Sequence, residues 1–154
     1  MLSAHEFTVG TIGQATPLTL VMPRYHGEES ILIAHAEKGP AAFFLSGGDR
    51  FRCFESTGND AWRGLLVPDV RIEVDVKSVF SPDYTVVGPG SVTRENDGLY
   101  VVARGEGIRV VTKLTLETDL APASATAAFS RWSIVLGEGT HKHVLHEVNM
   151  ASPH

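Results

Sequence analysis

The segment from Val70 to Phe80 constrains the fold of this chain more than any other stretch of its sequence. Apolar and charged residues alternate along it. The apolar positions share one parity and are Val70, Ile72, Val74, Val76 and Phe80; the charged positions share the other and are Arg71, Glu73, Asp75 and Lys77. Because successive side chains of a β-strand point to opposite faces, this pattern predicts a strand over 70–80 with one buried and one solvated face. A helix would scatter these β-branched residues around its axis and forgo their preference for strands.

Most of the remaining sequence consists of short apolar segments separated by glycine and proline turns. Further strands are expected at 17–22, 30–37, 41–45, 50–55, 62–67, 84–87, 92–95, 99–104, 108–118, 129–136 and 141–150. Two of these segments, 30–37 and 41–45, are apolar on both parities, which is typical of strands covered on both faces. Gly47-Gly48-Asp49 indicates a hairpin turn because glycine reaches positive φ without steric cost. No segment carries a convincing helical pattern.

The pattern as a whole predicts an all-β fold. We expect an antiparallel two-sheet β-sandwich of jelly-roll or meander type, with a small closed β-barrel as the alternative. A length of 154 residues and a hydrophobic fraction of 43% are typical of one folded unit with a proper core. The sequence therefore predicts a single all-β domain over residues 1–154.

Composition narrows the classes of partner. The formal net charge is −5, and the tightest basic grouping is only Arg50 and Arg52, so nucleic acid is not an expected partner. Cys53 is the single cysteine, which excludes an intramolecular disulfide and suits a reducing compartment. The sequence shows neither a secretory signal nor an apolar run near the roughly 20 residues that span a bilayer. We expect a cytoplasmic protein with no membrane partner.

One group of residues has the chemistry of metal ligands. If 141–150 is a strand, then His141, His143 and Glu147 share one parity and project from one face. Two imidazoles and a carboxylate can hold one divalent transition metal with open coordination positions. Their spacing, H-x-H-x₃-E, resembles the first motif of the cupin family, whose small β-barrels bind a metal with those residue types and a further histidine. The resemblance implies a metal-dependent enzyme or sensor, in which His35 or His26 would be the candidate for a fourth ligand.

The same segment also has a purely structural interpretation. The opposite parity is mostly apolar and would be the natural core face; it holds Val144, His146, Val148 and Met150. The three candidate ligands would then lie on the solvent side of the strand, and His146 would be a hydrogen-bonded core histidine. The chain also departs from the cupin pattern at Val135, where the family has glycine, and the family's second motif does not follow.

The two carboxylates of Glu73 and Asp75 are a further candidate for catalytic groups. Two-residue spacing on a strand separates their backbones by about 7 Å, which is compatible with a catalytic carboxylate pair. Arg71 and Lys77 flank them, however, and this pattern indicates a solvated face with cross-strand ion pairs.

Three functions remain open at the level of sequence. The favoured one is a non-enzymatic binding or assembly module, with homo-oligomerisation expected because a second copy could cover the two-sided apolar strands. The second is the cupin-like metal protein. The third is a barrel or open sandwich that holds a small apolar ligand among aromatic side chains. The candidates for that lining are Phe43, Phe44, Phe51, Phe54, Trp62 and Trp132.

Overall fold

The computed structural model describes residues 2–23, 30–36, 39–56, 62–81, 87–95, 98–104, 115–118 and 127–150. Within these ranges the regular structure is β-strand, with three short 3₁₀ turns, η1 (Ile12–Gln14), η2 (Val76–Ser78) and η3 (Gly139–His141). The same ranges contain no helix that is long and apolar enough to cross a lipid bilayer. The expected strand over 84–87, except its last residue, the first part of 108–118, and His26 lie outside the described residues.

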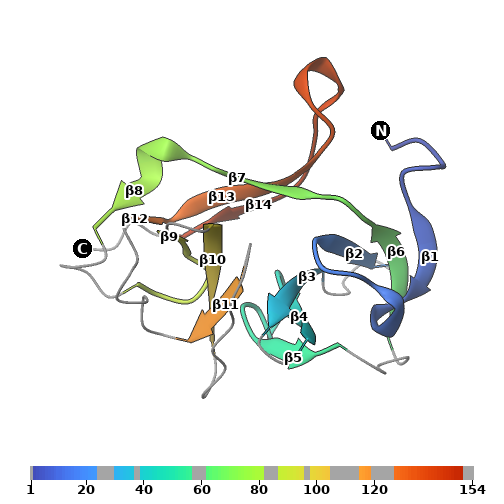
Figure 1. Cartoon of the computed structure of the whole chain (residues 1–154), viewed down its shortest axis with the longest axis horizontal. Coiled ribbons are helices and arrows are strands. Elements are labelled where there is room, and N and C mark those ends of the chain that lie inside the picture. The colour runs from blue at the N-terminus through green and yellow to red at the C-terminus, as the bar shows by residue number, and fades with distance from the viewer. Residues whose placement is uncertain are drawn as a thin grey trace.

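Six strands form the first half of the larger sheet. In spatial order they are β1 (Thr8–Thr11), β6 (Arg63–Val67), β2 (Thr19–Pro23), β3 (Ile31–Ala36), β4 (Gly39–Phe44) and β5 (Cys53–Glu55), and each neighbour pair is antiparallel. Figure 1 shows this half on one side of the molecule, together with the N-terminal segment.

The second half of the larger sheet lies on the other side (Figure 1). Its order is β11 (Thr115–Thr118), β10 (Gly98–Ala103), β9 (Val92–Glu95), β12 (Ala127–Phe129) and β8 (Val79–Phe80). The halves meet where Thr115 pairs with His35 and where Arg52 forms an isolated bridge with Arg104. β11 runs parallel to both of its neighbours, β10 and β3, while the other strand pairs of the described ranges are antiparallel.

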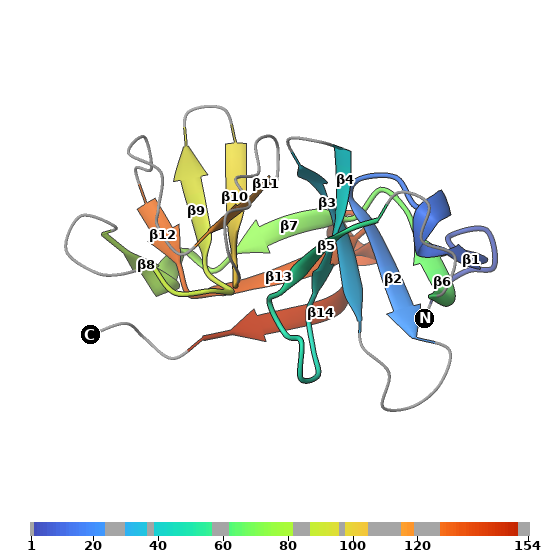
Figure 2. The same cartoon turned by 90° about the horizontal axis from the view of Figure 1, so that it is seen from below.

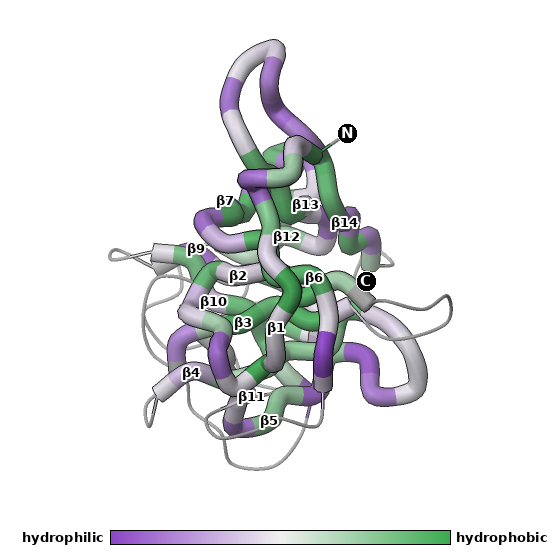
Figure 3. Tube along the Cα trace, turned by 90° about the vertical axis from the view of Figure 1, so that its right-hand side faces the viewer, coloured by the Kyte–Doolittle hydropathy of each residue, from purple (hydrophilic) through white to green (hydrophobic). Residues whose placement is uncertain are grey.

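A separate three-stranded sheet covers both halves. It consists of β14 (His143–Asn149), β13 (Arg131–Leu136) and β7 (Arg71–Val74), and in Figure 2 it runs lengthwise across the strands of both halves. One core cluster joins all three parts, because Phe43 of the first half, Val101 of the second and Ile134 of the three-stranded sheet belong to it. Figure 3 shows hydrophobic residues along the central strands and hydrophilic ones in the loop beyond β13 and β14.

The expected all-β class is confirmed, but the alternative of a closed barrel is wrong. The strand order of the larger sheet is open in the described residues, running from β1 at one end to β8 at the other, with β4 and β5 branching from β3. A closed barrel would require the first and last strands to pair.

The expected two-sided burial of β3 and β4 is confirmed. Leu32 and Phe43 lie in the main core, while Ile33 and Phe44 belong to a second cluster on the opposite face. Ile12 of η1 packs in this second cluster, so elements of the same chain cover both faces.

The expected strand over 70–80 is correct only as far as Val74. At Asp75 the chain leaves the three-stranded sheet, makes η2, and enters the larger sheet as β8. The Asp75 carboxylate accepts a hydrogen bond from the Lys77 N–H at 2.9 Å, and this local bond competes with strand pairing. As a result Val76, which alternation places in the core, is 70% exposed.

Candidate functional site

The strongest candidate for a binding site is a pocket of about 350 Å³ on the face of the first half that faces away from the three-stranded sheet. We call it the aromatic pocket. Most of its lining residues are apolar and two are acidic; the lining residues are Ile12, Ala42, Phe44, Asp49, Phe54, Glu55 and Trp62.

Strand register brings two of the aromatic residues to this face. Phe54 of β5 lies opposite Ala42 of β4, and Phe44 lies two residues further along β4, so alternation gives all three side chains the same face. The Phe44 and Phe54 rings meet edge to face, with centroids 5.3 Å apart and planes at 88°. Phe44 is buried at the base of the cluster, while Phe54 keeps 46% of its surface exposed.

The third ring comes from the residue just before β6. Trp62 meets Phe44 at 5.6 Å between centroids and 74° between planes, and it is 39% exposed. Its backbone is fixed because the Ile12 N–H donates a 3.1 Å hydrogen bond to the Trp62 carbonyl. The Gln14 side chain in turn accepts a hydrogen bond from the Thr11 N–H at 2.9 Å, which ties down the η1 turn beside it.

The charged part of the lining is acidic. Asp49 lies in the turn between β4 and β5, and Glu55 ends β5. Arg52 reaches Asp49 with its guanidinium at 3.4 Å, but both side chains are about half exposed, so this pair is weak and screened. The described lining contains no Lys, Arg or His, although the Arg52 guanidinium lies next to it through the pair with Asp49.

The six aromatic residues that the sequence proposes as the lining of a ligand pocket lie in two different places in the structure. Phe44, Phe54 and Trp62 line the aromatic pocket. The other three belong to the main core and are Phe43, Phe51 and Trp132. Sequence alternation does not find Ile12 or Asp49, because their approach to the aromatic rings depends on the η1 turn and on the β4–β5 turn. It does not find Glu55 either, because Glu55 lies opposite Ala41, on the other face of the strand from Phe54.

The predicted metal ligands do not share one face. His143 lies opposite Leu136 on β13, whereas Glu147 lies opposite Ser133, three residues along the same strand. Since directly opposed residues share a face, His143 and Glu147 project to opposite sides of the sheet. The cause is a bulge in β14, where the register shifts between Ile134 and Val135 of the partner strand and one extra residue is inserted.

His141 belongs to η3 rather than to the strand, and it is exposed. His35, the candidate for a fourth ligand, pairs with Thr115 in the larger sheet, where β3 meets β11. Among all described residues, no group of three or more His, Cys, Asp or Glu side chains lies close enough to hold a metal ion. Metal binding by His141, His143 and Glu147 therefore stays a prediction, for which elemental analysis of the His141→Ala/His143→Ala double variant is the test.

The bulge also changes the expected core face of β14. Val148 is buried, as alternation predicts, but Val144 is 52% exposed because it lies on the other side of the bulge. His146 is half-buried, and burial lowers its pKa, with the nearby Arg50 charge acting in the same direction and Glu147 opposing both.

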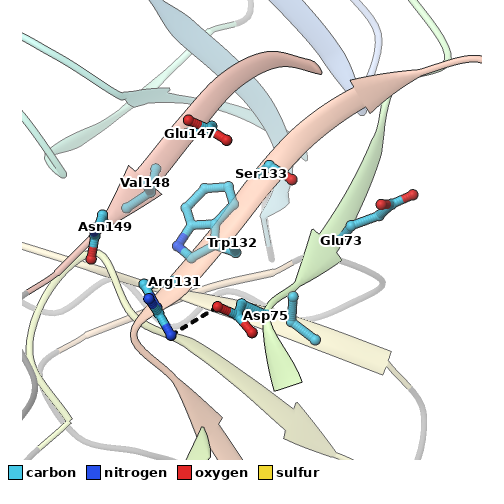
Figure 4. Close-up of a pocket in the computed structure, with 9 residues that line it drawn as sticks. Glu73, Asp75, Arg131, Trp132, Ser133, Glu147, Val148 and Asn149 are labelled. Carbon is cyan, nitrogen blue, oxygen red and sulfur yellow. Dashed lines mark ion pairs between the residues drawn. The ribbon is translucent and has the colours of Figure 1, made fainter. Parts of the chain in front are cut away.

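A second, polar groove of about 360 Å³ lies on the outer face of the three-stranded sheet. Figure 4 shows the acidic residues Glu73, Asp75 and Glu147 there, with the ion pair between Asp75 and Arg131. That pair measures 2.9 Å.

The carboxylates of this groove are mostly occupied by neighbouring cations. Glu73 contacts Lys142 at 2.9 Å and Arg71 at 3.4 Å. The hydrogen bond from Lys142 is the main cause of the lowered pKa of Glu73. The predicted ion-paired, solvated face is thus confirmed for Glu73 and Asp75, although Lys142 and Arg131, and not Lys77, supply the close cations.

Cys53 lies in the main core next to the β4–β5 turn. Burial raises the pKa of its thiol to about 11, so the thiol stays protonated at neutral pH. This agrees with its interpretation as a small buried hydrophobic residue, since nucleophilic cysteines require the thiolate.

Comparison with known proteins gives a family but no described activity. A family model described as "Uncharacterised protein y4lG" matches residues 9–154. The "Uncharacterized protein y4lG" of Sinorhizobium fredii is 46% identical over 147 residues, which cover 94% of this chain and 91% of that protein. No solved structure matches the chain.

Proposed function

We propose that this chain, which belongs to the y4lG family, is a non-enzymatic binding module that takes a small ligand in the aromatic pocket. The observation that carries the proposal is the contact of Phe54 and Trp62 with the buried Phe44 around a pocket of about 350 Å³. Ligand sites of proteins have volumes of about 300–1,000 Å³ and a mainly apolar lining with few polar groups.

Exposure of the two outer rings supports the same proposal. Aromatic side chains half exposed beside a pocket lose water when a ligand enters, and each square ångström of apolar surface buried contributes about 25 cal/mol. Phe54 and Trp62 are held by contact with Phe44 and by the β-sheet below, so little side-chain entropy is lost on binding.

A two-sheet sandwich is part of this proposal. The three-stranded sheet packs its apolar side over both halves of the larger sheet, and Trp132 and Val148 contribute to the common core. In such a sandwich the aromatic pocket lies on an outer face, on strands whose other face is fixed by the core.

The test is a titration of isotopically labelled protein with benzyl alcohol, followed by NMR of the two tryptophan indole N–H groups. We expect the Trp62 signal to shift and the signal of the buried Trp132 to stay unchanged. Trp62→Phe assigns the two signals. Absence of a Trp62 shift at millimolar benzyl alcohol, or equal shifts of both signals, would overturn the proposal.

A further inference from the structure

We infer that the ligand of the aromatic pocket is a small organic cation, an alkylated ammonium group carried on an apolar body. This inference rests on the proposed binding function and adds the chemical class of the ligand. Three features of the pocket support it: the arrangement of its rings, the sign of its charges and the apolar character of the rest of its lining.

Two of the three rings that line the pocket stand steeply to the third. Phe54 and Trp62 stand at 88° and 74° to the plane of Phe44, and all three line the same space. The face of an aromatic ring carries a negative quadrupole, and a cation within about 6 Å of its centroid is attracted. Alkylated ammonium ions use such sites well because their charge is spread over methyl groups that also gain from leaving water.

The charges of the lining have the complementary sign. Asp49 and Glu55 are the acidic residues of the lining, and the described lining contains no Lys, Arg or His. Arg52 pairs with Asp49 at 3.4 Å, and its side chain is 54% exposed, so solvent screens this pair and leaves part of the Asp49 charge available. A ligand carboxylate or phosphate would be repelled here, whereas an ammonium group would be attracted.

The remaining lining defines the other part of the ligand. Ile12 and Ala42 are buried members of the second core cluster and offer only aliphatic surface. A pocket of about 350 Å³ is larger than a trimethylammonium group alone requires, and it therefore has room for an apolar body attached to that group. The size is that of a free small molecule, and we assign the pocket to such a ligand.

The experiment compares three probes of nearly the same shape and different charge. They are choline, its neutral isostere 3,3-dimethyl-1-butanol, and the anion 3,3-dimethylbutanoate. Each has nine equivalent methyl protons, so binding to the full chain can be measured from the broadening of one ligand NMR signal. We expect choline to bind about five- to tenfold more tightly than the neutral alcohol, and the anion to bind more weakly than either.

Variants separate attraction by the rings from simple apolar contact. Trp62→Leu and Phe54→Leu keep an apolar side chain and remove an aromatic face, so we expect choline to lose most of its preference while the neutral alcohol still binds. Glu55→Gln should weaken choline binding about threefold without affecting the alcohol. Glu147→Gln makes the same change of charge in the polar groove, outside the aromatic pocket, and should leave both affinities unchanged.

A further variant tests the sign of the charge effect in the opposite direction. Arg52→Gln removes the competing cation of Asp49 and should tighten choline binding about twofold. Equal affinity for choline and 3,3-dimethyl-1-butanol would overturn the cation inference and leave the proposed binding function standing. If neither probe binds while benzyl alcohol shifts the Trp62 signal, the inference fails and the proposed function stands. If benzyl alcohol fails as well, both fail.

Discussion

At the scale of single residues, Gly90 shows how one missing Cβ allows the main core to close. Its φ is +91°, and a Cβ at this position would lie 2.5 Å from the Phe51 ring. The Gly90 carbonyl also accepts a 2.7 Å hydrogen bond from the indole N–H of Trp132, which is buried. The backbone of Gly90 thus approaches two core aromatic side chains at once.

We predict that Gly90→Ala destabilises the protein by more than about 1 kcal/mol, because the methyl group meets the Phe51 ring and the positive φ is strained for alanine. Gly88→Ala, two residues earlier, is the matched control, since its Cβ would meet nothing within 4 Å. It should change stability by no more than about 0.5 kcal/mol. Urea unfolding measures both, and equal stabilities of the two variants would contradict the prediction.

A second feature at the residue scale is His146, which makes the stability of the protein depend on pH. Its pKa in the folded protein is lowered, mainly by burial, from an ordinary value of about 6.5. The unfolded chain therefore takes up the proton more readily than the folded one. Its contribution to stability is present above about pH 6.5 and is lost as the pH falls through the folded pKa.

We predict that His146→Gln has a flatter dependence of stability on pH between pH 7.5 and 5 than the original chain, because glutamine has no proton to take up. Denaturant midpoints across this range are the measurement. Glu6 and Glu73 have lowered pKa values, so their contribution is lost at more acidic pH and does not obscure the comparison. An identical slope in the variant would show that His146 does not contribute.

At the scale of elements, the corner at Asp75 moves the chain from the three-stranded sheet into the larger sheet. The carboxylate accepts from the Lys77 N–H and pairs with Arg131, and the Ser78 hydroxyl donates to the Asp75 carbonyl at 2.7 Å. These contacts hold the η2 turn between β7 and β8.

We predict that Asp75→Ala costs about 1–2 kcal/mol in the free energy of unfolding, because it leaves the Lys77 N–H without its acceptor. Asp75→Asn keeps that acceptor and loses only the exposed pair with Arg131, so it should cost less than about 1 kcal/mol. Chemical denaturation of both variants checks the order. A more damaging Asn variant would mean that the ion pair, and not the turn, holds the corner.

Alternation of apolar and polar residues predicts most of the strands, because burial of one face of a sheet requires an apolar residue at every second position. It correctly places Val70 in the main core, with Ile72 and Val74 packed against it. It fails at Asp75 and at the β14 bulge, where one local bond or one extra residue reverses the faces of everything that follows. Neither event changes the composition of the segment.

The candidate site could be predicted only in part for a related reason. Phe44 and Phe54 follow from alternation and from the β4–β5 hairpin, whose turn glycines are visible in the sequence. The approach of Trp62 and Ile12 could not be predicted, since it depends on a backbone hydrogen bond between segments about 50 residues apart, which short-range patterns do not encode.

At the scale of the whole molecule, the three-stranded sheet joins the two halves of the larger sheet through one core. We predict that Ile134→Ala, at a fully buried position, destabilises the protein by about 2–5 kcal/mol and lowers the stability of both halves equally. Hydrogen exchange of amides in β3 and β10 measures this. Val144→Ala, at an exposed position of the adjacent strand, is the control, and a loss of protection confined to one half would contradict the prediction.

Burial within the single chain also bears on the expected homo-oligomer. Both faces of β3 and β4 are already covered by residues of the same chain, so their two-sided apolar pattern does not require a second copy. Oligomerisation stays a prediction that needs its own measurement, and sedimentation at high protein concentration provides it. A monomer under those conditions would rule it out.

The order in which the strands are made has a consequence for folding in the cell. β1 to β6 can pair with one another as soon as Val67 has been synthesised, since the antiparallel pairs among them lie within that segment. Their core face, with Leu32 and Phe43, shares its cluster with Trp132 and Ile134 of β13 and Val148 of β14, which the ribosome makes much later. During translation an apolar surface is therefore exposed until β13 and β14 have been made, and such exposed surface favours aggregation of the nascent chain.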